Sequence, residues 1–374
     1  MNNDPANINR ISFLLLGYIV SKKPVVCLLC GGQSPEHEIS LLSAWGVYQA
    51  LNREQYEVQV VGISKEGIWQ HFGDRDFLMD RQDPRKIRLA DDGKVCFLCR
   101  NSVHARLWEL GTGQEYSIDL AFPVLHGANG EDGTIQGLFQ MLGLPYVGCD
   151  QMSSANCMDK TVTKMLLNCN GLPTARGIVI RDPKDSVRFQ QALDTFGLPL
   201  FVKPACTGSS VGISKVKTVE QLAQAVALAF KYDDKILLEE AISGREIECA
   251  VLDEGKQIFC PPPGEVIPHD EFYSYAAKYL SKDGATLKVP AELETHQVEE
   301  VRELAARAFI ALDCRGMARV DFFLKPDGTW ILNEINTIPG FTSISLYPQL
   351  MIKAGISYPE LVSKLLARAL YSPT

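Results

Sequence analysis

The sequence predicts an α/β protein in which a doubly wound, parallel-sheet domain is followed by a part with α+β character. Apolar runs at residues 25–30 and 120–125 each end in a glycine-rich turn that leads into a helical pattern, as in parallel sheets covered by helices. Farther along, strand patterns follow one another directly, at 235–240 and 244–251 and around an Asp-Gly pair at 327–328. At 374 residues the chain is too long for one ordinary core, so two or three domains are expected.

The composition narrows the class of protein. Of the 374 residues, 46% are hydrophobic and 22% charged, and the net charge is -8. This balance is typical of a globular protein and argues against nucleic-acid and membrane partners. The 11 cysteines, an odd number and many of them in apolar runs, fit the reducing cytoplasm. The C-x-x-C spacings at Cys27 and Cys96 lie in strand-like runs, where positions i and i+3 face opposite ways, so core thiols are expected rather than zinc ligands.

Residues 1–23 are expected to form an N-terminal extension. Their apolar run at 11–20 is too short to span a bilayer, and no small-residue cleavage site follows it. A misassigned leader or an appendage that packs on the body is therefore favoured over a secretion signal.

Residues 24–159 are expected to form the first domain. Strand 25–30 leads into the turn 31–40, a helix at about 41–51 and a strand at 56–63. Ligands of such folds bind at the carboxyl ends of the strands, and Glu36 lies there, where a carboxylate could hold a substrate ammonium. The alternative is that Glu36 only marks the helix entry, where the helix dipole favours an acid. The turn lacks the G-x-G-x-x-G pattern of dinucleotide sites.

A second glycine-rich loop follows strand 120–125. Residues 126–137 contain His126 and four glycines, which indicates that the backbone approaches another group closely. For His126 alone, a loop-capping role and a place beside a substrate both remain open.

Residues 160–246 are expected to form a central lobe. Strand 199–204 carries Lys203 and ends in a Gly/Ser-rich loop at 205–212, whose backbone N–H groups could wrap phosphates. The loop is not a P-loop, because no G-x-x-x-x-G-K-[ST] occurs in the chain.

Residues 247–374 are expected to form a C-terminal lobe with a lid at about 268–283, a polar and aromatic stretch without a clear period. A helix at about 292–312 precedes a hairpin, and two helices end the chain.

The hairpin at 319–336 carries the most specific chemistry. If Asp327 and Gly328 are the two loop residues, Asp321 lies opposite Glu334 and Arg319 opposite Asn336. Two opposed carboxylates repel each other, so a cation is expected between them. Acid and amide oxygens suit magnesium. The alternative is a solvated face on which Arg319 pairs with Asp321.

Four segments, at 31–40, 126–137, 203–212 and 319–340, together resemble the D-alanine–D-alanine ligase family of ATP-grasp enzymes. The resemblance covers nearly the whole chain from about residue 24. It implies a two-lobed ATP-grasp fold after the first domain, a cytoplasmic homodimer, and ATP-dependent joining of two D-alanine molecules for peptidoglycan precursors. The reaction would pass through an acyl phosphate and a tetrahedral intermediate.

The resemblance also implies a role for each matching residue. Asp321, Glu334 and Asn336 would hold two Mg²⁺ (or Mn²⁺) ions on the phosphates of ATP. The nucleotide would be bound by Lys160, Lys203, Glu239, Glu240, Ile242, Glu246, Phe272 and Lys278. Glu240 and Ala241 depart from the family, whose members often have Lys and an aromatic residue at these positions.

For the amino-acid substrates, the resemblance implies that Glu36 binds the first ammonium and is linked to Ser209 and Tyr279. Arg319 and the Gly340 backbone would stabilise the oxyanion. Ser345 and Leu346 would hold the carboxylate and backbone of the second D-alanine, and His126 would lie near it.

Two rival functions remain at this stage. The first is a ligase whose second substrate is D-lactate or D-serine. Tyr279 argues against D-lactate, because it matches the family's dipeptide-forming members and relatives that make D-alanyl-D-lactate depart at this position. The second is a nucleotide-binding relative without catalysis, which would have no chemical reason to keep the whole phosphate and metal set.

Overall fold

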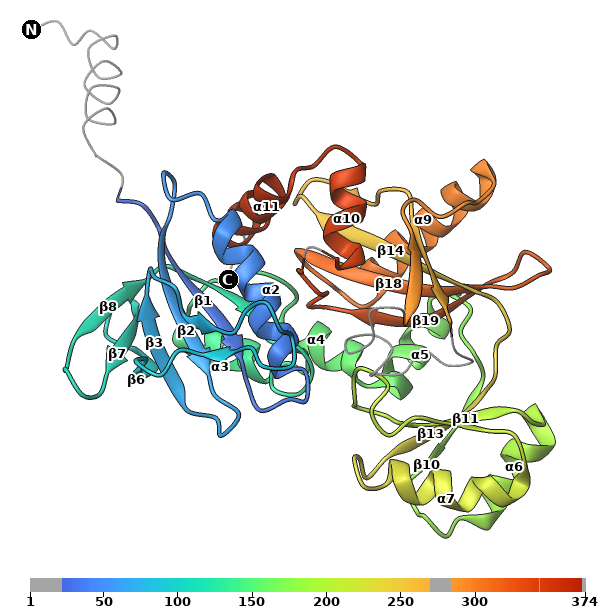
Figure 1. The fold of residues 1–374 in the computed structure, drawn as a ribbon. Helices are drawn as coiled ribbons and strands as arrows, with labels where there is room; N and C mark the ends of the chain where they lie inside the picture. Colours follow the sequence, from blue (N-terminus) through green and yellow to red (C-terminus); the bar gives the residue numbers. More distant parts are fainter. Residues whose placement is uncertain (1–21, 270–283, 343, 372–374) are drawn as a thin grey trace, which may run out of the picture.

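The computed structural model describes residues 22–269, 284–342 and 344–371. Three units are visible in Figure 1: an N-terminal domain, a central lobe below the rest of the molecule, and a C-terminal lobe. Helices α4 (Gln151–Met158) and α5 (Lys160–Cys169) lie where the three units meet. The two-lobed arrangement after the first domain is confirmed. Within the described residues, no helix is both long and apolar enough to cross a membrane.

The N-terminal sheet has a parallel centre and an antiparallel extension. Strand β1 (Val25–Gly31) pairs in parallel with β2 (Glu57–Ile63) and β9 (Leu120–Val124), as predicted. The sheet continues through antiparallel strands, in the order β8-β7-β6-β3-β2-β1-β9. The remaining elements of this domain are α2 (His37–Ala50), β3 (Trp69–Gly73), β4 (Leu78–Met79), β5 (Arg88–Leu89), β6 (Lys94–Arg100), β7 (Ala105–Glu109), β8 (Glu115–Ile118) and α3 (Thr134–Leu142).

Strand β1 is fully buried because both of its faces are covered. Val26 and Leu28 pack in one core with residues of α2, whereas Cys27 and Leu29 pack in a second core with residues of β7 and α3. This explains its continuous apolar run. Cys27, Cys30 and Cys96 are buried core thiols. In the described part of the chain, no group of three or more Cys, His, Asp or Glu side chains is placed to hold a metal ion.

The central lobe is a four-stranded antiparallel sheet, in the order β10-β13-β11-β12, packed against α6 and α7. Its strands place Lys203 and Glu239 next to each other on neighbouring strands, which matters for the site below. The elements are β10 (Gly177–Ile180), α6 (Ser186–Phe196), β11 (Leu200–Pro204), β12 (Ser214–Val216), α7 (Val219–Ala229) and β13 (Ile236–Glu240).

The C-terminal lobe is a six-stranded sheet, in the order β17-β16-β14-β18-β19, with β15 paired to β14. Helix α9 packs on one face, and α10 covers part of the other face around Ala250 and Leu252. The part of that second face that α10 does not cover carries the acids of the candidate site. Strand β14 begins at Arg245, so the expected domain boundary at residue 246 falls inside it. The elements are β14 (Arg245–Asp253), β15 (Ile258–Phe259), β16 (Gly264–Pro268), β17 (Ala285–Lys288), α9 (Thr295–Ala311), β18 (Met317–Leu324), β19 (Trp330–Asn336), α10 (Leu346–Lys353) and α11 (Tyr358–Leu370).

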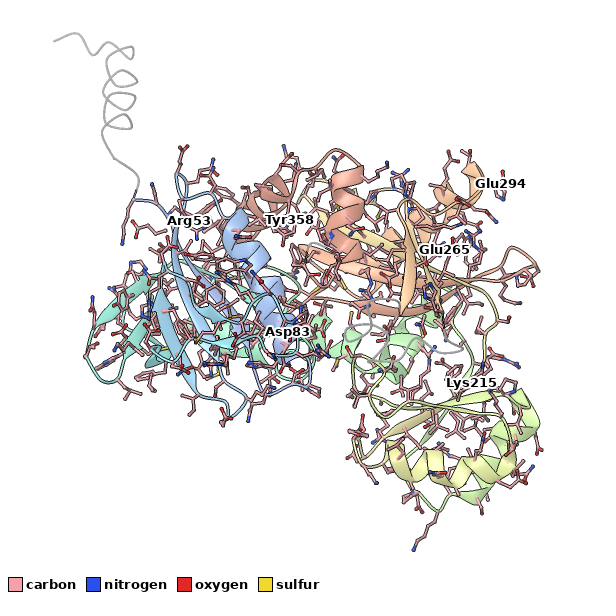
Figure 2. All side chains as sticks on the ribbon, in the orientation of Figure 1. Arg53, Asp83, Lys215, Glu265, Glu294 and Tyr358 are labelled. Atoms are coloured by element: carbon pink, nitrogen blue, oxygen red, sulfur yellow. The ribbon has the colours of Figure 1, made fainter. Side chains whose placement is uncertain are left out.

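The C-terminal helices hold the end of the hairpin against the N-terminal domain. The Tyr358 hydroxyl of α11 donates to the Phe341 carbonyl at 2.5 Å, and Figure 2 shows Tyr358 where α11 meets α2. A Cβ on Gly46 of α2 would lie 2.8 Å from both the Phe341 oxygen and the Tyr358 hydroxyl. The bare glycine therefore allows the close approach of α2 to these two residues.

The hairpin register is as predicted at the site, but the predicted two-residue turn is wrong. Lys325 N–H donates to the Thr329 carbonyl at 3.0 Å, which closes a three-residue loop with Gly328 at φ 85°. This loop shifts the pairing by one residue, so Phe322 lies opposite Leu332. A bulge at Asn333 then restores the predicted pairs, Asp321 with Glu334 and Arg319 with Asn336.

Candidate active site

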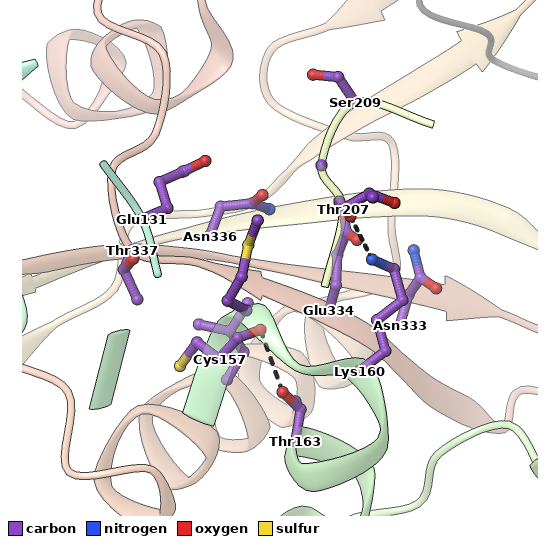
Figure 3. Close-up of a pocket in the computed structure, with 13 residues that line it drawn as sticks. Glu131, Cys157, Lys160, Thr163, Thr207, Ser209, Asn333, Glu334, Asn336 and Thr337 are labelled. Atoms are coloured by element: carbon purple, nitrogen blue, oxygen red, sulfur yellow. Dashed lines mark hydrogen bonds between the residues drawn. The ribbon is translucent and has the colours of Figure 1, made fainter. Parts of the chain in front are cut away.

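A polar pocket lies where the N-terminal domain, the central lobe and the hairpin meet (Figure 3). Its lining comes from the loop after β9, from α4 and α5, from the Gly/Ser-rich loop and from β19. The lining residues are Glu131, Cys157, Met158, Lys160, Thr163, Thr207, Gly208, Ser209, Asn333, Glu334, Ile335, Asn336 and Thr337.

The hairpin contributes a row of charged and amide groups. Asp321 and Glu334 are directly opposed, as predicted. Arg319 donates two hydrogen bonds to Asp321, from Nε at 2.8 Å and from Nη2 at 2.7 Å, and Asn336 Nδ2 donates to Asp321 Oδ2 at 3.0 Å. The Arg319–Asp321 pair, which was the less favoured alternative from the sequence, is therefore present in the structure. Part of the expected positive charge beside the two acids is the guanidinium of Arg319.

A third acid that the sequence argument missed extends the row. Glu248 of β14 pairs with Asp321 in the sheet, so Glu248, Asp321 and Glu334 lie side by side on three neighbouring strands. Arg319 Nε lies 3.0 Å from Glu248 Oε2. Arg319 contacts Asp321 and Glu248 and is also influenced by the charge of Glu334. The carboxylates of Asp321 and Glu334 and the amide oxygen of Asn336 are hard donors that suit a divalent cation. The alternation of Glu246 and Glu248 was a signal for an acidic strand face, but only the sheet pairing shows which acids it joins.

Lysines gather close to Glu334 and Glu239. Lys203 and Lys164 both pair with the buried Glu239, with Lys164 Nζ 2.8 Å from Oε2. Burial alone would raise the pKa of Glu239, but the two ammonium groups lower it to about 2. Lys160 donates to the Thr207 carbonyl (Figure 3), and burial lowers the pKa of its ammonium while nearby Glu334 opposes that shift. Lys164 was also missed, although its i,i+4 spacing from Lys160 places both on one face of α5.

The low pKa of Glu239 predicts an acid-sensitive fold. A depressed pKa stabilises the folded protein at pH values above the ordinary carboxyl pKa of 4.5, and this contribution is lost as the pH falls towards about 2. The free energy of unfolding of the native protein should fall between pH 4.5 and 2 by on the order of 3 kcal/mol more than that of Glu239→Gln. Urea unfolding of both proteins at stepped pH measures the difference. Equal slopes in this pH range would contradict the assignment.

The residues expected around the adenosine differ in their surroundings. Glu239 is only 2% exposed and faces the lysines. Glu240 accepts hydrogen bonds from the Arg176 backbone N–H, Nε and Nη2 at 2.6–2.8 Å, so its carboxylate is held at the edge of the central sheet. Ile242 and Glu246 follow and are partly buried.

Glu36 lies where three loops meet. It occupies the N-cap position of α2, but its side chain caps no helix N–H. Instead its carboxylate accepts a hydrogen bond from Ser209 Oγ, 173 residues away, as the family resemblance implied. A Cβ on Gly127 would lie 2.8 Å from Glu36 Oε2, and one on Gly208 would lie 3.3 Å from it. The glycines therefore let two backbone segments approach this carboxylate, and the helix-entry alternative alone does not explain its contacts.

His126 and Glu131 are buried neighbours of Glu36. His126 is buried, which lowers the pKa of its imidazole, and its Nδ1 and Nε2 lie 3.0 Å from the Ile338 carbonyl and 3.2 Å from Ser43 Oγ. These bonds tie three segments together, as expected of a structural histidine. Glu131, which the sequence argument passed over, accepts from the Gly127 N–H at 2.8 Å. Burial and the neighbouring Glu36 raise the pKa of Glu131 to about 8.

Comparison with known proteins decides the family. A model described as the D-ala D-ala ligase N-terminus matches residues 25–149, and one described as the D-ala D-ala ligase C-terminus matches residues 166–367. The chain belongs to the D-alanine–D-alanine ligase family.

Individual relatives agree with this family. The D-alanine–D-alanine ligase A of Chromobacterium violaceum is 45% identical over 349 residues, covering 92% of this chain and 94% of the relative. The D-alanine–D-alanine ligase of Caldicellulosiruptor bescii is 45% identical over 92% of this chain and 94% of its own length. Among solved structures, the D-alanine–D-alanine ligase of Coxiella burnetii has a TM-score of 0.80 at 36% identity, covering 94% of each chain. The VanG D-Ala:D-Ser ligase of Enterococcus faecalis has a TM-score of 0.82 at 32% identity, covering 93% of this chain and 100% of that chain.

The loop after the hairpin supplies the last group of residues that the ligase family resemblance singled out. Ser345 precedes α10, and its Oγ accepts from the Thr342 N–H at 3.1 Å. A Cβ on Gly340 would lie 2.8 Å from that oxygen, so a side chain at residue 340 would displace the Ser345 hydroxyl. The side chain of Leu346 is buried in the core, which leaves its backbone at the first turn of α10.

The structure thus brings Glu36, Ser209, Lys160, Lys203, Arg319, Asp321, Glu334 and Asn336 around one region. Phe272, Lys278 and Tyr279, together with nearly all of the expected lid, lie outside the described residues.

Proposed function

We propose that this protein joins two D-alanine molecules to D-alanyl-D-alanine for peptidoglycan precursor synthesis, converting ATP to ADP and phosphate. The observation that carries the proposal is the gathering of acids and lysines at the pocket. Glu334 and Lys160 both line it (Figure 3), Asp321 lies opposite Glu334 in the sheet, and Lys203 lies near Lys160. A polyphosphate bound between them would meet lysines directly and acids through divalent cations.

The hairpin acids would hold the metal. Asp321, Glu334 and Asn336 present hard oxygens on one face and fit two Mg²⁺ or Mn²⁺ ions. Such ions, when bound, neutralise charge on the transferred phosphoryl group. Lys160 and Lys203 would add point charges on the phosphates, with Lys160 oriented by the Thr207 carbonyl. Glu240, Ile242 and Glu246 would lie on the adenosine side, with Phe272 and Lys278 contributed by the lid.

Glu36 would bind the ammonium of the first D-alanine. Its link to Ser209 ties the N-terminal domain to the Gly/Ser-rich loop of the central lobe, so the substrate carboxylate would be held near the phosphates. Glu131, whose pKa is raised to about 8, is mostly protonated at pH 7. Tyr279 would complete this group from the lid.

Arg319 and the Gly340 backbone would stabilise the oxyanion that forms when the second amine attacks the acyl phosphate. Ser345 and the backbone of Leu346 would hold the carboxylate of the second D-alanine. His126 would fix the segment that carries Gly340, because it lies 3.0 Å from the Ile338 carbonyl.

The second substrate distinguishes this proposal from its nearest alternative. One solved relative is named a D-Ala:D-Ser ligase, at 32% identity, whereas curated relatives at 42–45% identity are named D-alanine–D-alanine ligases. Phosphate release should therefore be measured with ATP, magnesium and D-alanine alone, and then with D-lactate or D-serine added. Release with D-alanine alone is expected, together with formation of the dipeptide. Absence of release with D-alanine alone would refute the proposal.

The oligomeric state and the cellular compartment are part of the same proposal. The family resemblance favours a homodimer that forms through the first domain, in the cytoplasm. Light scattering of the purified protein should give a mass near 83 kDa, which is twice 41.4 kDa. A mass near 41.4 kDa would contradict the dimer.

A further inference from the structure

Arg319 stands between two acids, and only one of them belongs to the metal set. Its Nε carries a single hydrogen, which it donates to Asp321 Oδ1 at 2.8 Å. The same nitrogen lies 3.0 Å from Glu248 Oε2. The Arg319, Asp321 and Glu248 side chains are 19%, 12% and 14% exposed, so water screens this cluster only weakly.

Metal binding by Asp321 and the positioning of Arg319 both depend on the carboxylate of Asp321. Asp321 would bind the cation, yet in the structure its two oxygens accept from Arg319 Nε and Nη2. A carboxylate that turns towards a divalent ion weakens its hydrogen bonds to the guanidinium. Without a second acceptor, Arg319 would lose its anchor just when the oxyanion needs it.

We infer that Glu248 is a positioning residue, which accepts the hydrogen bond of Arg319 Nε when Asp321 binds the metal. This inference rests on the proposed function. Sheet pairing places Glu248 opposite Asp321 and Ala250 opposite Arg319. The guanidinium of Arg319 already lies within ion-pair distance of Glu248. The Nε hydrogen needs only to change acceptor, because both oxygens lie within 3.0 Å of the nitrogen.

If Arg319 changes its acceptor in this way, replacing Glu248 should weaken metal binding and not only activity. In Glu248→Gln, Arg319 should stay on Asp321 and compete with the cation. The affinity for Mn²⁺ in the presence of ADP should therefore fall about tenfold. Electron paramagnetic resonance measures this affinity, because the signal of the free ion is lost when Mn²⁺ binds. Arg319→Met removes the competitor, so it should bind Mn²⁺ at least as tightly as the native protein.

A double-mutant cycle separates this exchange from the loss of one nearby negative charge. In the Arg319→Met background, Glu248→Gln should weaken Mn²⁺ binding by no more than about threefold, since no guanidinium remains to be held. Equal effects in the two backgrounds would overturn the inference. Glu248→Asp, which keeps the charge, should bind Mn²⁺ within about threefold of the native protein, and Glu248→Ala replaces Glu248→Gln in the cycle if the glutamine variant does not fold.

The native protein supplies the remaining control. If it binds no Mn²⁺ in the presence of ADP, the proposed function fails and this inference fails with it. If it binds Mn²⁺ but the cycle is additive, only the role of Glu248 is wrong.

Discussion

Glu334→Ala is expected to lower turnover by about 10³-fold or more while the protein stays folded. Glu334 would provide a metal ligand, and the charge on the transferred phosphoryl group would then be poorly neutralised. The fold should survive because Glu334 lies opposite another acid, Asp321, and opposed like charges destabilise a sheet. Steady-state phosphate release and thermal unfolding measure the two effects separately.

A matched acid in the same hairpin serves as the control. Asp327 lies in the loop, where it pairs with Lys325 at 3.0 Å, and it is not among the residues that line the pocket. Asp327→Ala should keep nearly native turnover. Full activity of Glu334→Ala at ordinary magnesium concentrations would refute the metal assignment.

Glu36→Gln is expected to lower kcat/KM for D-alanine by about 10²-fold or more. The substitution keeps the size of the side chain and a hydrogen-bond acceptor for Ser209, but it removes the charge that would bind the substrate ammonium. Ser209→Ala leaves that charge in place and should cost only about tenfold, because it removes a hydrogen bond that orients the carboxylate.

Glu38 offers the control for this second experiment. It lies two residues along α2 and pairs with Lys65 at the surface, outside the pocket lining. Glu38→Gln should leave kcat/KM for D-alanine unchanged. If Glu36→Gln and Glu38→Gln gave the same small effect, Glu36 would be a helix-entry residue and not a substrate ligand.

The parts of the fold that could be predicted from the sequence are those where burial makes a clear pattern. Strands β1 and β9 were predictable because both of their faces are covered, which gives continuous apolar runs. The strands at residues 69–118 were not predicted. On β6 and β7, Phe97 and Trp108 stack on the solvent side and are 40% and 39% exposed. Apolar residues on both faces erase the alternation that would reveal a strand.

The site could be predicted only where its residues are close in sequence. Asp321 and Glu334 could be paired from one hairpin, although the predicted turn was wrong and the bulge at Asn333 compensated for it. A bulge depends on how the strand packs, so alternation alone does not reveal it. The Glu36–Ser209 contact spans 173 residues and came from the family resemblance alone. Glu248 was missed because its pairing with Asp321 depends on the order of strands in the sheet.

The most direct test of the central claim traces a carboxyl oxygen of D-alanine into the phosphate that is released. The pocket lined by Lys160 and Glu334 is proposed to be where the carboxylate of D-alanine is activated as an acyl phosphate. With D-alanine labelled with ¹⁸O in its carboxyl group, attack on ATP followed by displacement should leave one ¹⁸O in the inorganic phosphate that is released. Mass spectrometry of that phosphate should show the label whenever the dipeptide is formed. Dipeptide formation with unlabelled phosphate would contradict phosphoryl transfer to the substrate at this site.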